Sequence, residues 1–217
     1  IAGAAQLNTD IPKTKPAHSL RLLTWNIGAL EYNNPTPPNA HIAQAIKDVD
    51  PDVIVMQECS SNFVNWNEFL SSLPGYQSFK SKEATTKGGI KYFVTILAKS
   101  NLGAQAIKLA TQKHQDRMVA IKVGNTQIVG LHAHYNPPAA IKQSLEADLG
   151  AIAKGSGIIF AGDFNQNSTN ALAILNQKGQ NYRDVFARSP PWTGSGNSAP
   201  DHVFADASKT VKGAYVY

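Results

Sequence analysis

Short, wholly apolar runs rich in β-branched residues constrain the fold of this chain more than any other feature. Residues 53–56 read Val-Ile-Val-Met, and residues 157–161 read Gly-Ile-Ile-Phe-Ala. Runs of this length without polar alternation are typical of strands that are buried on both faces. Between the runs, apolar residues recur at helical spacing. Short apolar strands mixed with helices predict an α/β sandwich.

The remaining elements follow from periodicity and from turn residues. Pro51 ends the first helical pattern, and Gly124-Asn125 is a tight-turn signal between two alternating runs. The predicted helices cover residues 41–49, 63–73, 139–153 and 169–176. The further predicted strands cover residues 20–25, 92–97, 118–123, 127–133, 202–205 and 210–217, with loops at 28–38 and 181–197.

The length of 217 residues favours one domain. Residues 1–18 are polar and contain two prolines, so we interpret them as a loose N-terminal arm. Residues 19–217 are interpreted as a single domain. No apolar run approaches the length of a membrane span.

The charge balance and the cysteine count limit the function. A formal net charge of +5 favours a polyanionic partner such as nucleic acid. Cys59 is the only cysteine, which excludes an internal disulfide and a cysteine-based zinc site. We expect Cys59 to be a small buried residue. The chain starts without methionine, as a processed protein or an expressed segment would, and a secreted or periplasmic location is slightly favoured over a cytoplasmic one.

Polar side chains follow the apolar strands at the points where the strands end. Asn26, Glu58, His132 and Asp163 each stand at such a position, and Asn165 comes two residues later. Any one of them has a structural reading, such as a loop cap, a salt bridge, a core histidine or an Asx turn. Together, two carboxylates and two carboxamides supply the hard oxygen ligands that suit Mg²⁺, and also Mn²⁺ or Ca²⁺, rather than zinc.

Two further side chains suit phosphate chemistry. His132 could handle a proton or donate a hydrogen bond to a phosphate. Arg117, at the start of a predicted strand, offers a planar fork that fits phosphate oxygens.

Five segments occur in the order expected for one known group of proteins, and the chain resembles that group from about residue 20 to its end. The group is the endonuclease/exonuclease/phosphatase (deoxyribonuclease I-like) superfamily, and the resemblance is nearest to the deoxyribonuclease and cytolethal distending toxin nuclease branch. It implies a four-layer sandwich of two packed mixed β-sheets flanked by helices. The segments are Thr24-Trp25-Asn26-Ile27, Val55-Met56-Gln57-Glu58, Gly130-Leu131-His132-Ala133, Ala161-Gly162-Asp163-Phe164-Asn165 and Asp201-His202-Val203-Phe204.

The resemblance implies roles for the residues at these positions. Glu58 would be the principal ligand of Mg²⁺, with Asn26 beside it. Asp163 and Asn165 would bind the phosphate, the metal or the nucleophilic water, and His132 would contact the scissile phosphate.

Two more roles are implied in the same way. Asp201 would support a neighbouring catalytic group. Arg117 matches an arginine that often precedes the central strand pair of the family.

The chain departs from the family at its C-terminal end. The family normally ends on Ser-Asp-His followed by an aromatic residue and proline, and that histidine commonly activates water. Asp201-His202 is either this terminal pair or an earlier Ile-Asp-His segment, and its short spacing from Asp163 favours the earlier segment. The domain would then lack its C-terminal segment, or His134 would substitute, or the domain would be inactive.

Three other residues have both a functional and a structural reading. Trp192, in a loop rich in glycine and serine, could stack on a base or anchor the loop. Lys87 and Lys91 flank two glycines and could touch phosphate or be ordinary surface lysines.

The predicted function is a metal-dependent phosphodiesterase that hydrolyses nucleic acid, with DNA endonuclease activity as the leading hypothesis. A phosphatase or lipid phosphodiesterase on the same scaffold is the second hypothesis. The third is an inactive phosphate-binding or interaction module. Whether a delivery or inhibitor protein binds the chain is left open.

Overall fold

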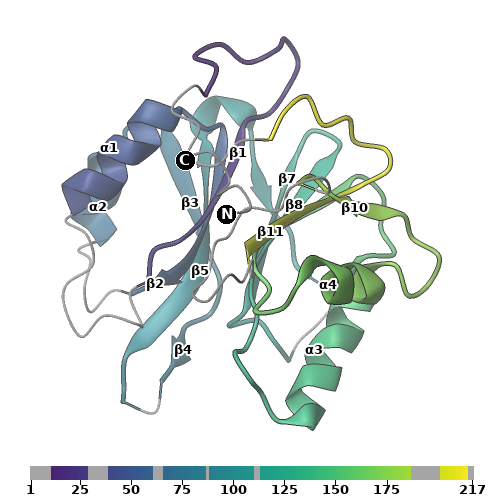
Figure 1. Cartoon of the computed structure of the whole chain (residues 1–217). Helices are drawn as coiled ribbons and strands as arrows, with labels where there is room; N and C mark the ends of the chain where they lie inside the picture. Colours follow the sequence, from purple (N-terminus) through teal and green to yellow (C-terminus); the bar gives the residue numbers. More distant parts are fainter. Residues whose placement is uncertain are drawn as a thin grey trace, which may run out of the picture.

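Two mixed β-sheets lie face to face between two layers of helices (Figure 1). The structure is a computed structural model that describes residues 11–28, 39–60, 66–86, 88–109, 113–186 and 201–214. The prediction of an α/β four-layer sandwich is therefore confirmed.

The first sheet has the strand order β1-β2-β5-β3, and β4 pairs with β5 outside this path. Among the described strand pairs of this sheet, β1 and β2 are parallel and the others are antiparallel. The helices α1 and α2 cover its outer face, where Ile46 and Phe69 pack against Phe93 and other side chains of the sheet. The bounds are β1 (Leu22–Asn26), α1 (Asn39–Val49), β2 (Val53–Cys59), α2 (Trp66–Ser71), β3 (Tyr76–Lys80), β4 (Ala84–Thr85) and β5 (Lys91–Lys99).

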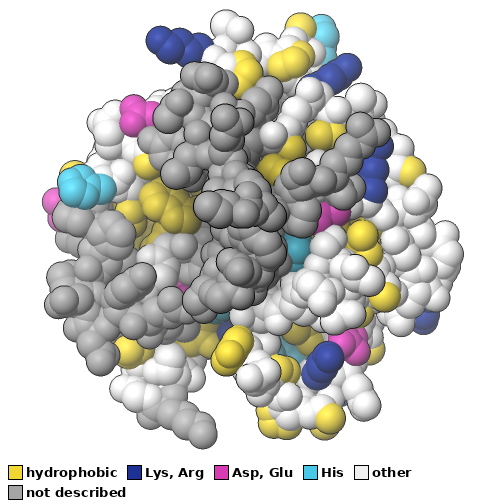
Figure 2. All heavy atoms as spheres, in the orientation of Figure 1, with side chains coloured by type: hydrophobic (Ala, Val, Ile, Leu, Met, Phe, Trp, Pro, Cys, Tyr) yellow, Lys and Arg dark blue, Asp and Glu magenta, His cyan; other side chains and the backbone are white. Residues whose placement is uncertain are grey.

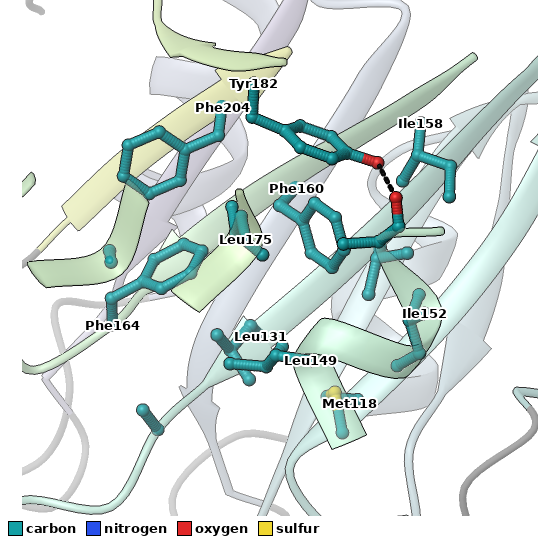
Figure 3. Close-up of a cluster of buried hydrophobic side chains, with 14 of the residues drawn as sticks. Met118, Leu131, Leu149, Ile152, Ile158, Phe160, Phe164, Leu175, Tyr182 and Phe204 are labelled. Carbon is teal, nitrogen blue, oxygen red and sulfur yellow. Dashed lines mark hydrogen bonds between the residues drawn. The ribbon is translucent and has the colours of Figure 1, made fainter. Parts of the chain in front are cut away.

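The second sheet has the order β10-β11-β9-β8-β7-β6, with β8 and β9 as its parallel pair. The helices α3 and α4 cover its outer face over a cluster of buried aromatic and aliphatic side chains (Figure 3). In this cluster the Tyr182 hydroxyl donates to the Ala153 carbonyl at 3.0 Å. The bounds are β6 (Gln105–Ala106), β7 (Met118–Val123), β8 (Thr126–His132), α3 (Ala139–Ile152), β9 (Ile158–Asp163), α4 (Ser168–Leu175), β10 (Tyr182–Asp184) and β11 (Asp201–Asp206), and a 3-10 turn (Ser100–Leu102) follows β5.

A layer of buried apolar side chains separates the two sheets. Val55, Ile96, Ile121 and Ala161 belong to it and are less than 1% exposed. Gly130 lies against this layer, since a Cβ there would stand only 2.8 Å from Val55 Cγ1. The strands with continuous apolar runs are therefore those that face helices on one side and the other sheet on the other.

Several element boundaries differ from the sequence-based expectation. The helix predicted at 63–73 is described only as α2, and residues 61–65 lie outside the described residues. The strand predicted at 210–217 is wrong for residues 210–214, which pair with no strand of the described sheets. The strands β3, β4, β6 and β10 were not predicted, and β10 lies inside the region expected to be a loop. All four are short and lie at the margins of the sheets, so packing leaves little periodic signal in their sequence.

The described part of the predicted arm, residues 11–18, contacts the domain. Lys15 forms a salt bridge with Asp52, whose side chain is 3% exposed. Asp52 also accepts a hydrogen bond from the Arg21 backbone at 2.8 Å and lies 3.5 Å from the Lys99 ammonium. Burial alone would raise the pKa of Asp52, but these partners lower it below the ordinary value.

None of the described helices is both long enough and apolar enough to cross a membrane.

Candidate active site

Four polar side chains stand in a row across adjacent strands of the second sheet. His132 is the register partner of Asp163, and Asp163 is the partner of Asp201 on the next strand. On the other side, the His132 backbone donates to the Arg117 carbonyl at 2.9 Å. Directly paired residues project from the same face of a sheet. Arg117, His132, Asp163 and Asp201 are therefore neighbours at one end of the sheet, as expected for residues at strand ends.

A β-bulge positions the carboxylate from the first sheet. In the β2–β5 pair, Met56 faces Thr95 while Cys59 faces Phe93, so β2 carries one extra residue. Glu58 lies in this bulge with a φ of 55°. Bulges redirect side chains next to active sites, and left-handed backbone at a residue other than glycine costs about 1–3 kcal/mol. The bulge therefore turns Glu58 at the expense of local strain.

Asn26 is hydrogen-bonded to a carboxylate of each sheet. Its Nδ2 donates to Glu58 Oε1 at 3.2 Å and to Asp163 Oδ2 at 3.0 Å. His132 Nε2 lies 3.7 Å from the same Glu58 oxygen and 3.9 Å from the same Asp163 oxygen. The structure thus brings together Asn26, Glu58, His132 and Asp163, which the sequence analysis selected from four separate segments.

A tight turn after β9 adds the second carboxamide. The Asn165 backbone donates to Asp163 Oδ1 at 2.8 Å, which closes an Asx turn, and Asn165 has a φ of 49°. Its Nδ2 donates to the Ala133 carbonyl at 2.8 Å. This bond fixes the side-chain amide so that Oδ1 is the atom left for a ligand.

His132 is a neutral side chain inside this site. Burial, the positive charge of Arg117 and the nearby His134 lower the pKa of His132 to about 3. The ring is 5% exposed, and its Nδ1 has no hydrogen-bond partner among the described residues. An unsatisfied buried ring nitrogen costs free energy unless a ligand or water reaches it. His132 is therefore suited to hydrogen bonding with a substrate rather than to carrying a charge.

Tyr92 connects His132 to Arg117 and was not selected from the sequence. The Arg117 guanidinium carbon lies 5.0 Å from the centre of the Tyr92 ring, and that ring meets the His132 ring edge-on at 5.9 Å. Arg117 is 9% exposed and its Nε lies 3.4 Å from Asp116. Burial raises the pKa of Tyr92, so its hydroxyl stays protonated. The only feature of the sequence that could have pointed to Tyr92 is its position at the start of the strand predicted at residues 92–97.

The two remaining candidate histidines lie in other surroundings. His202 is 3% exposed, and its Nε2 bonds to the Gln166 carbonyl at 2.9 Å. It lies next to Asp201 on β11, so its side chain projects from the opposite face of that strand. This burial does not suit His202 to the activation of water, which the alternative alignment would require.

His134, the suggested substitute, packs against His114 with a ring separation of 5.9 Å. His114 in turn bonds to the Ser144 hydroxyl of α3 at 3.1 Å. Burial and the charge of Arg117 lower the pKa of His134, so it is neutral near neutral pH.

Cys59 is fully buried, as predicted, and burial raises the pKa of its thiol well above the ordinary value. Lys91 is exposed and lies 3.9 Å from Glu83. Trp192 and Lys87 lie outside the described residues.

The carboxylate pair fits a hard divalent cation. Glu58 and Asp163 are 6% and 5% exposed and converge on one amide group. No cluster of three or more His, Cys, Asp or Glu that could hold a metal ion is found within the described ranges. Mg²⁺ needs only one or two carboxylates and keeps several waters, so Glu58 and Asp163 satisfy its requirements.

Asn26 does not offer an oxygen to such an ion in this arrangement. Its Oδ1 accepts a hydrogen bond from the Gly28 backbone at 2.9 Å, which turns Nδ2 towards the carboxylates. Asn26 therefore orients Glu58 and Asp163 in this arrangement, and its role as a ligand of the metal stays a prediction.

Comparison with known proteins agrees with this architecture. The sequence matches the Endonuclease/Exonuclease/phosphatase family over residues 23–217. The human Nocturnin catalytic domain with bound sulfate has a TM-score of 0.63 at 16% identity, over 91% of this chain and 88% of that one. D. rerio TDP2 complexed with a single-strand DNA product has a TM-score of 0.61 at 15% identity, over 88% and 86%. The 3′ phosphatase NExo from Neisseria, bound to a product DNA hairpin, has a TM-score of 0.61 at 13% identity, over 88% of each chain. No curated protein sequence matches the chain.

The fold, the paired carboxylates at the strand ends and the match over nearly the whole chain define one class of protein. The chain belongs to the endonuclease/exonuclease/phosphatase family of hydrolases.

Proposed function

We propose that this protein is a metal-dependent phosphodiesterase that hydrolyses nucleic acid, and that it acts on DNA as an endonuclease. The convergence of Glu58, Asp163 and the neutral His132 on one point between the two sheets carries the proposal. The net charge of +5 supports a polyanionic substrate. On the face seen in Figure 2, the described Lys and Arg side chains lie around the periphery rather than in one patch.

Glu58 and Asp163 would hold Mg²⁺, which would neutralise charge on the phosphate and on the leaving oxygen when bound. His132 would donate a hydrogen bond to the phosphate through a ring N–H, and its Nδ1 has no partner among the described residues. Arg117 would add positive charge at the end of the same row. Preorganised donors of this kind stabilise a transition state without reorganising during the reaction.

Asp163 has a second task in this mechanism. Its Oδ1 is held by the Asn165 backbone, while its Oδ2 faces Asn26 and His132. A carboxylate fixed at both oxygens can orient an attacking water. Asn165 Oδ1 would assist from the same turn. Asp201, the register partner of Asp163, would support a neighbouring catalytic group from the next strand.

Plasmid nicking with Mg²⁺ and with EDTA tests the proposal. Glu58→Ala and Asp163→Ala should each lower turnover by at least about 100-fold, the scale found for lost electrostatic and general-base groups. Asp48→Ala, which removes an exposed acid from α1, is the matched control and should keep wild-type turnover. Wild-type rates in either site variant, or nicking that survives EDTA, would refute the assignment.

A phosphatase is the second candidate, because one of the structural neighbours is a 3′ phosphatase bound to DNA. Release of inorganic phosphate from a 3′-phosphorylated oligonucleotide, without nicking of plasmid, would favour it. Both activities would require Glu58 and Asp163, so the same variants serve as controls.

A further inference from the structure

A buried histidine–aspartate pair lies behind the site and takes no part in the mechanism above. His202 Nδ1 on β11 is 3.6 Å from Asp184 Oδ2 on β10. The two residues are 3% and 6% exposed. Burial of two polar side chains costs free energy unless their hydrogen-bonding groups have partners. The hydrogen-bond partners of His202 and Asp184 therefore indicate the role of the pair.

Those partners belong to the segment that carries Asn165. His202 Nε2 bonds to the carbonyl of Gln166 at 2.9 Å, one residue after Asn165. The carboxylate of Asp184 is hydrogen-bonded by Ser168, the first residue of α4, and by the Phe186 backbone at 2.9 Å. Burial alone would raise the pKa of Asp184, but these bonds and His202 lower it, so it is ionised. The pair thus holds the chain between β9 and α4 at two points.

This segment needs external restraint. Asn165 adopts a φ of 49°, a conformation that persists only where the surroundings impose it. The backbone amide of Asn165 is fixed by its bond to Asp163 Oδ1, and the side chain is fixed by its bond to the Ala133 carbonyl. The carbonyl side of the turn is held by His202.

The chemistry of the contacts gives His202 a defined orientation. A backbone carbonyl only accepts hydrogen bonds, so Nε2 of His202 donates to the Gln166 carbonyl while Nδ1 faces the Asp184 carboxylate. The ring also stacks on Phe204 at 5.0 Å and meets Phe164 at 5.8 Å. Packing on two sides and polar partners at both nitrogens leave a single ring position.

We propose that His202 is a positioning residue for hydrolysis: oriented by Asp184, it sets the turn that presents Asn165 and Asp163 to the substrate. This inference rests on the proposed function. It assigns no contact between His202 and the substrate, and the effect is carried through the Gln166 carbonyl.

Three variants of the full chain test the proposal by steady-state kinetics. His202→Phe keeps an aromatic ring between Phe164 and Phe204 but removes both polar contacts. We expect it to lower kcat about tenfold or more, the scale found when a group that orients a ligand is lost, and to leave KM within about twofold. Asp184→Asn should give a smaller loss. His202→Gln, which retains an N–H donor for the carbonyl, should restore kcat to within about threefold of wild type.

The kinetic result must be separated from a general loss of stability. Tyr182→Phe is the matched control, since it removes a buried polar contact near Asp184 but one that reaches the Ala153 carbonyl rather than the turn. It should lower the melting temperature and leave kcat unchanged at temperatures where the protein is folded. A wild-type kcat in His202→Phe, or an equal loss of kcat in Tyr182→Phe, would overturn the proposal.

Hydrogen exchange of the Asn165 amide provides a readout that needs no activity. This amide donates to Asp163 Oδ1, so its exchange reports the closed turn. It should exchange faster in His202→Phe and at the wild-type rate in Tyr182→Phe. If the wild-type protein hydrolyses neither plasmid nor oligonucleotide, the proposed function fails while the exchange rates still decide the role of His202. Unchanged exchange in His202→Phe would refute that role.

Discussion

The neutral state of His132 is the property of a single residue on which much of the proposed chemistry depends. Its ring is enclosed by Tyr92, Arg117 and the ends of β8 and β9, and these surroundings lower the pKa to about 3. An enzyme that used a charged histidine here would lose activity as the pH rises through 6. We expect no such ionisation of His132 between pH 5 and pH 8, because the ring is uncharged throughout that range.

The lowered pKa of His132 also predicts a pH dependence of stability. The unfolded chain takes up a proton near pH 6.5, whereas the folded chain does so only near pH 3, so stability falls as the pH decreases between these values. Between pH 7 and pH 4.5 this one group should remove about 2–3 kcal/mol of unfolding free energy. His132→Gln should lose less stability over the same range, as measured by urea denaturation at each pH.

An NMR titration of the histidine side chains provides the direct control. The His132 signals of the folded protein should stay constant from pH 5 to pH 8. A His132 titration near pH 6.5 would contradict both expectations.

Sequence reasoning selected residues that the structure brings together, but it did not predict their conformations. Asn26, Glu58, His132 and Asp163 could be selected because each follows an apolar run. The orientation of the Asn26 amide depends on the Gly28 backbone, and the left-handed backbone at Glu58 depends on pairing between β2 and β5. Both are consequences of tertiary contacts, which no local pattern in the sequence records.

At the scale of the elements, the close approach of β8 and β9 depends on Gly162. Its φ is +142°, and a Cβ on it would stand 2.0 Å from the Leu131 carbonyl oxygen. Gly162 precedes Asp163, and Leu131 precedes His132. A side chain at position 162 would therefore push apart the two strands whose ends carry the site.

We expect Gly162→Ala to lower the unfolding free energy by about 3 kcal/mol or more, because overpacking and backbone strain add. Thermal or urea denaturation would measure the change. Gly88→Ala is the matched control, since its Cβ would meet only Thr86 Oγ1 at an ordinary 3.7 Å and should change stability by less than about 0.5 kcal/mol. Equal stability of the two variants would show that β8 and β9 can separate without cost.

The elements that were predicted correctly are those whose packing requires a recognisable pattern of apolar residues in the sequence. The runs at 53–56 and 157–161 are apolar because both faces of β2 and β9 are covered. β10 has only three residues, and β4 and β6 have two each, so neither alternation nor length marks them. The strand predicted at residues 210–217 is the opposite error, because residues 210–214 do not form it.

At the scale of the whole molecule, the two carboxylates of the site come from different sheets. Glu58 belongs to the first sheet and Asp163 to the second, with the apolar layer between the sheets beneath them. A cation held by both would bind the folded protein and not the unfolded chain, and would therefore stabilise it.

Addition of Mg²⁺ at about 100 times its dissociation constant should raise the unfolding free energy by about 2.7 kcal/mol. The melting temperature should rise by about 5–10 °C, as measured by scanning fluorimetry against NaCl of equal ionic strength. Asp163→Ala should lose this shift and Asp48→Ala should keep it. An equal shift in Asp163→Ala would place the ion elsewhere.

The division of the site between two sheets also bears on the synthesis of the protein. Glu58 lies in the first third of the chain, and Asp163 and Asn165 lie more than a hundred positions later. A domain folds as a unit, and the N-terminal part of the chain is synthesised first, so Asn26 and Glu58 leave the ribosome before Asp163 and Asn165 have been made. A partly synthesised or prematurely terminated chain has only one half of the catalytic centre. If the proposed function holds, such a chain would not hydrolyse nucleic acid, because it lacks the carboxylate that the second sheet contributes.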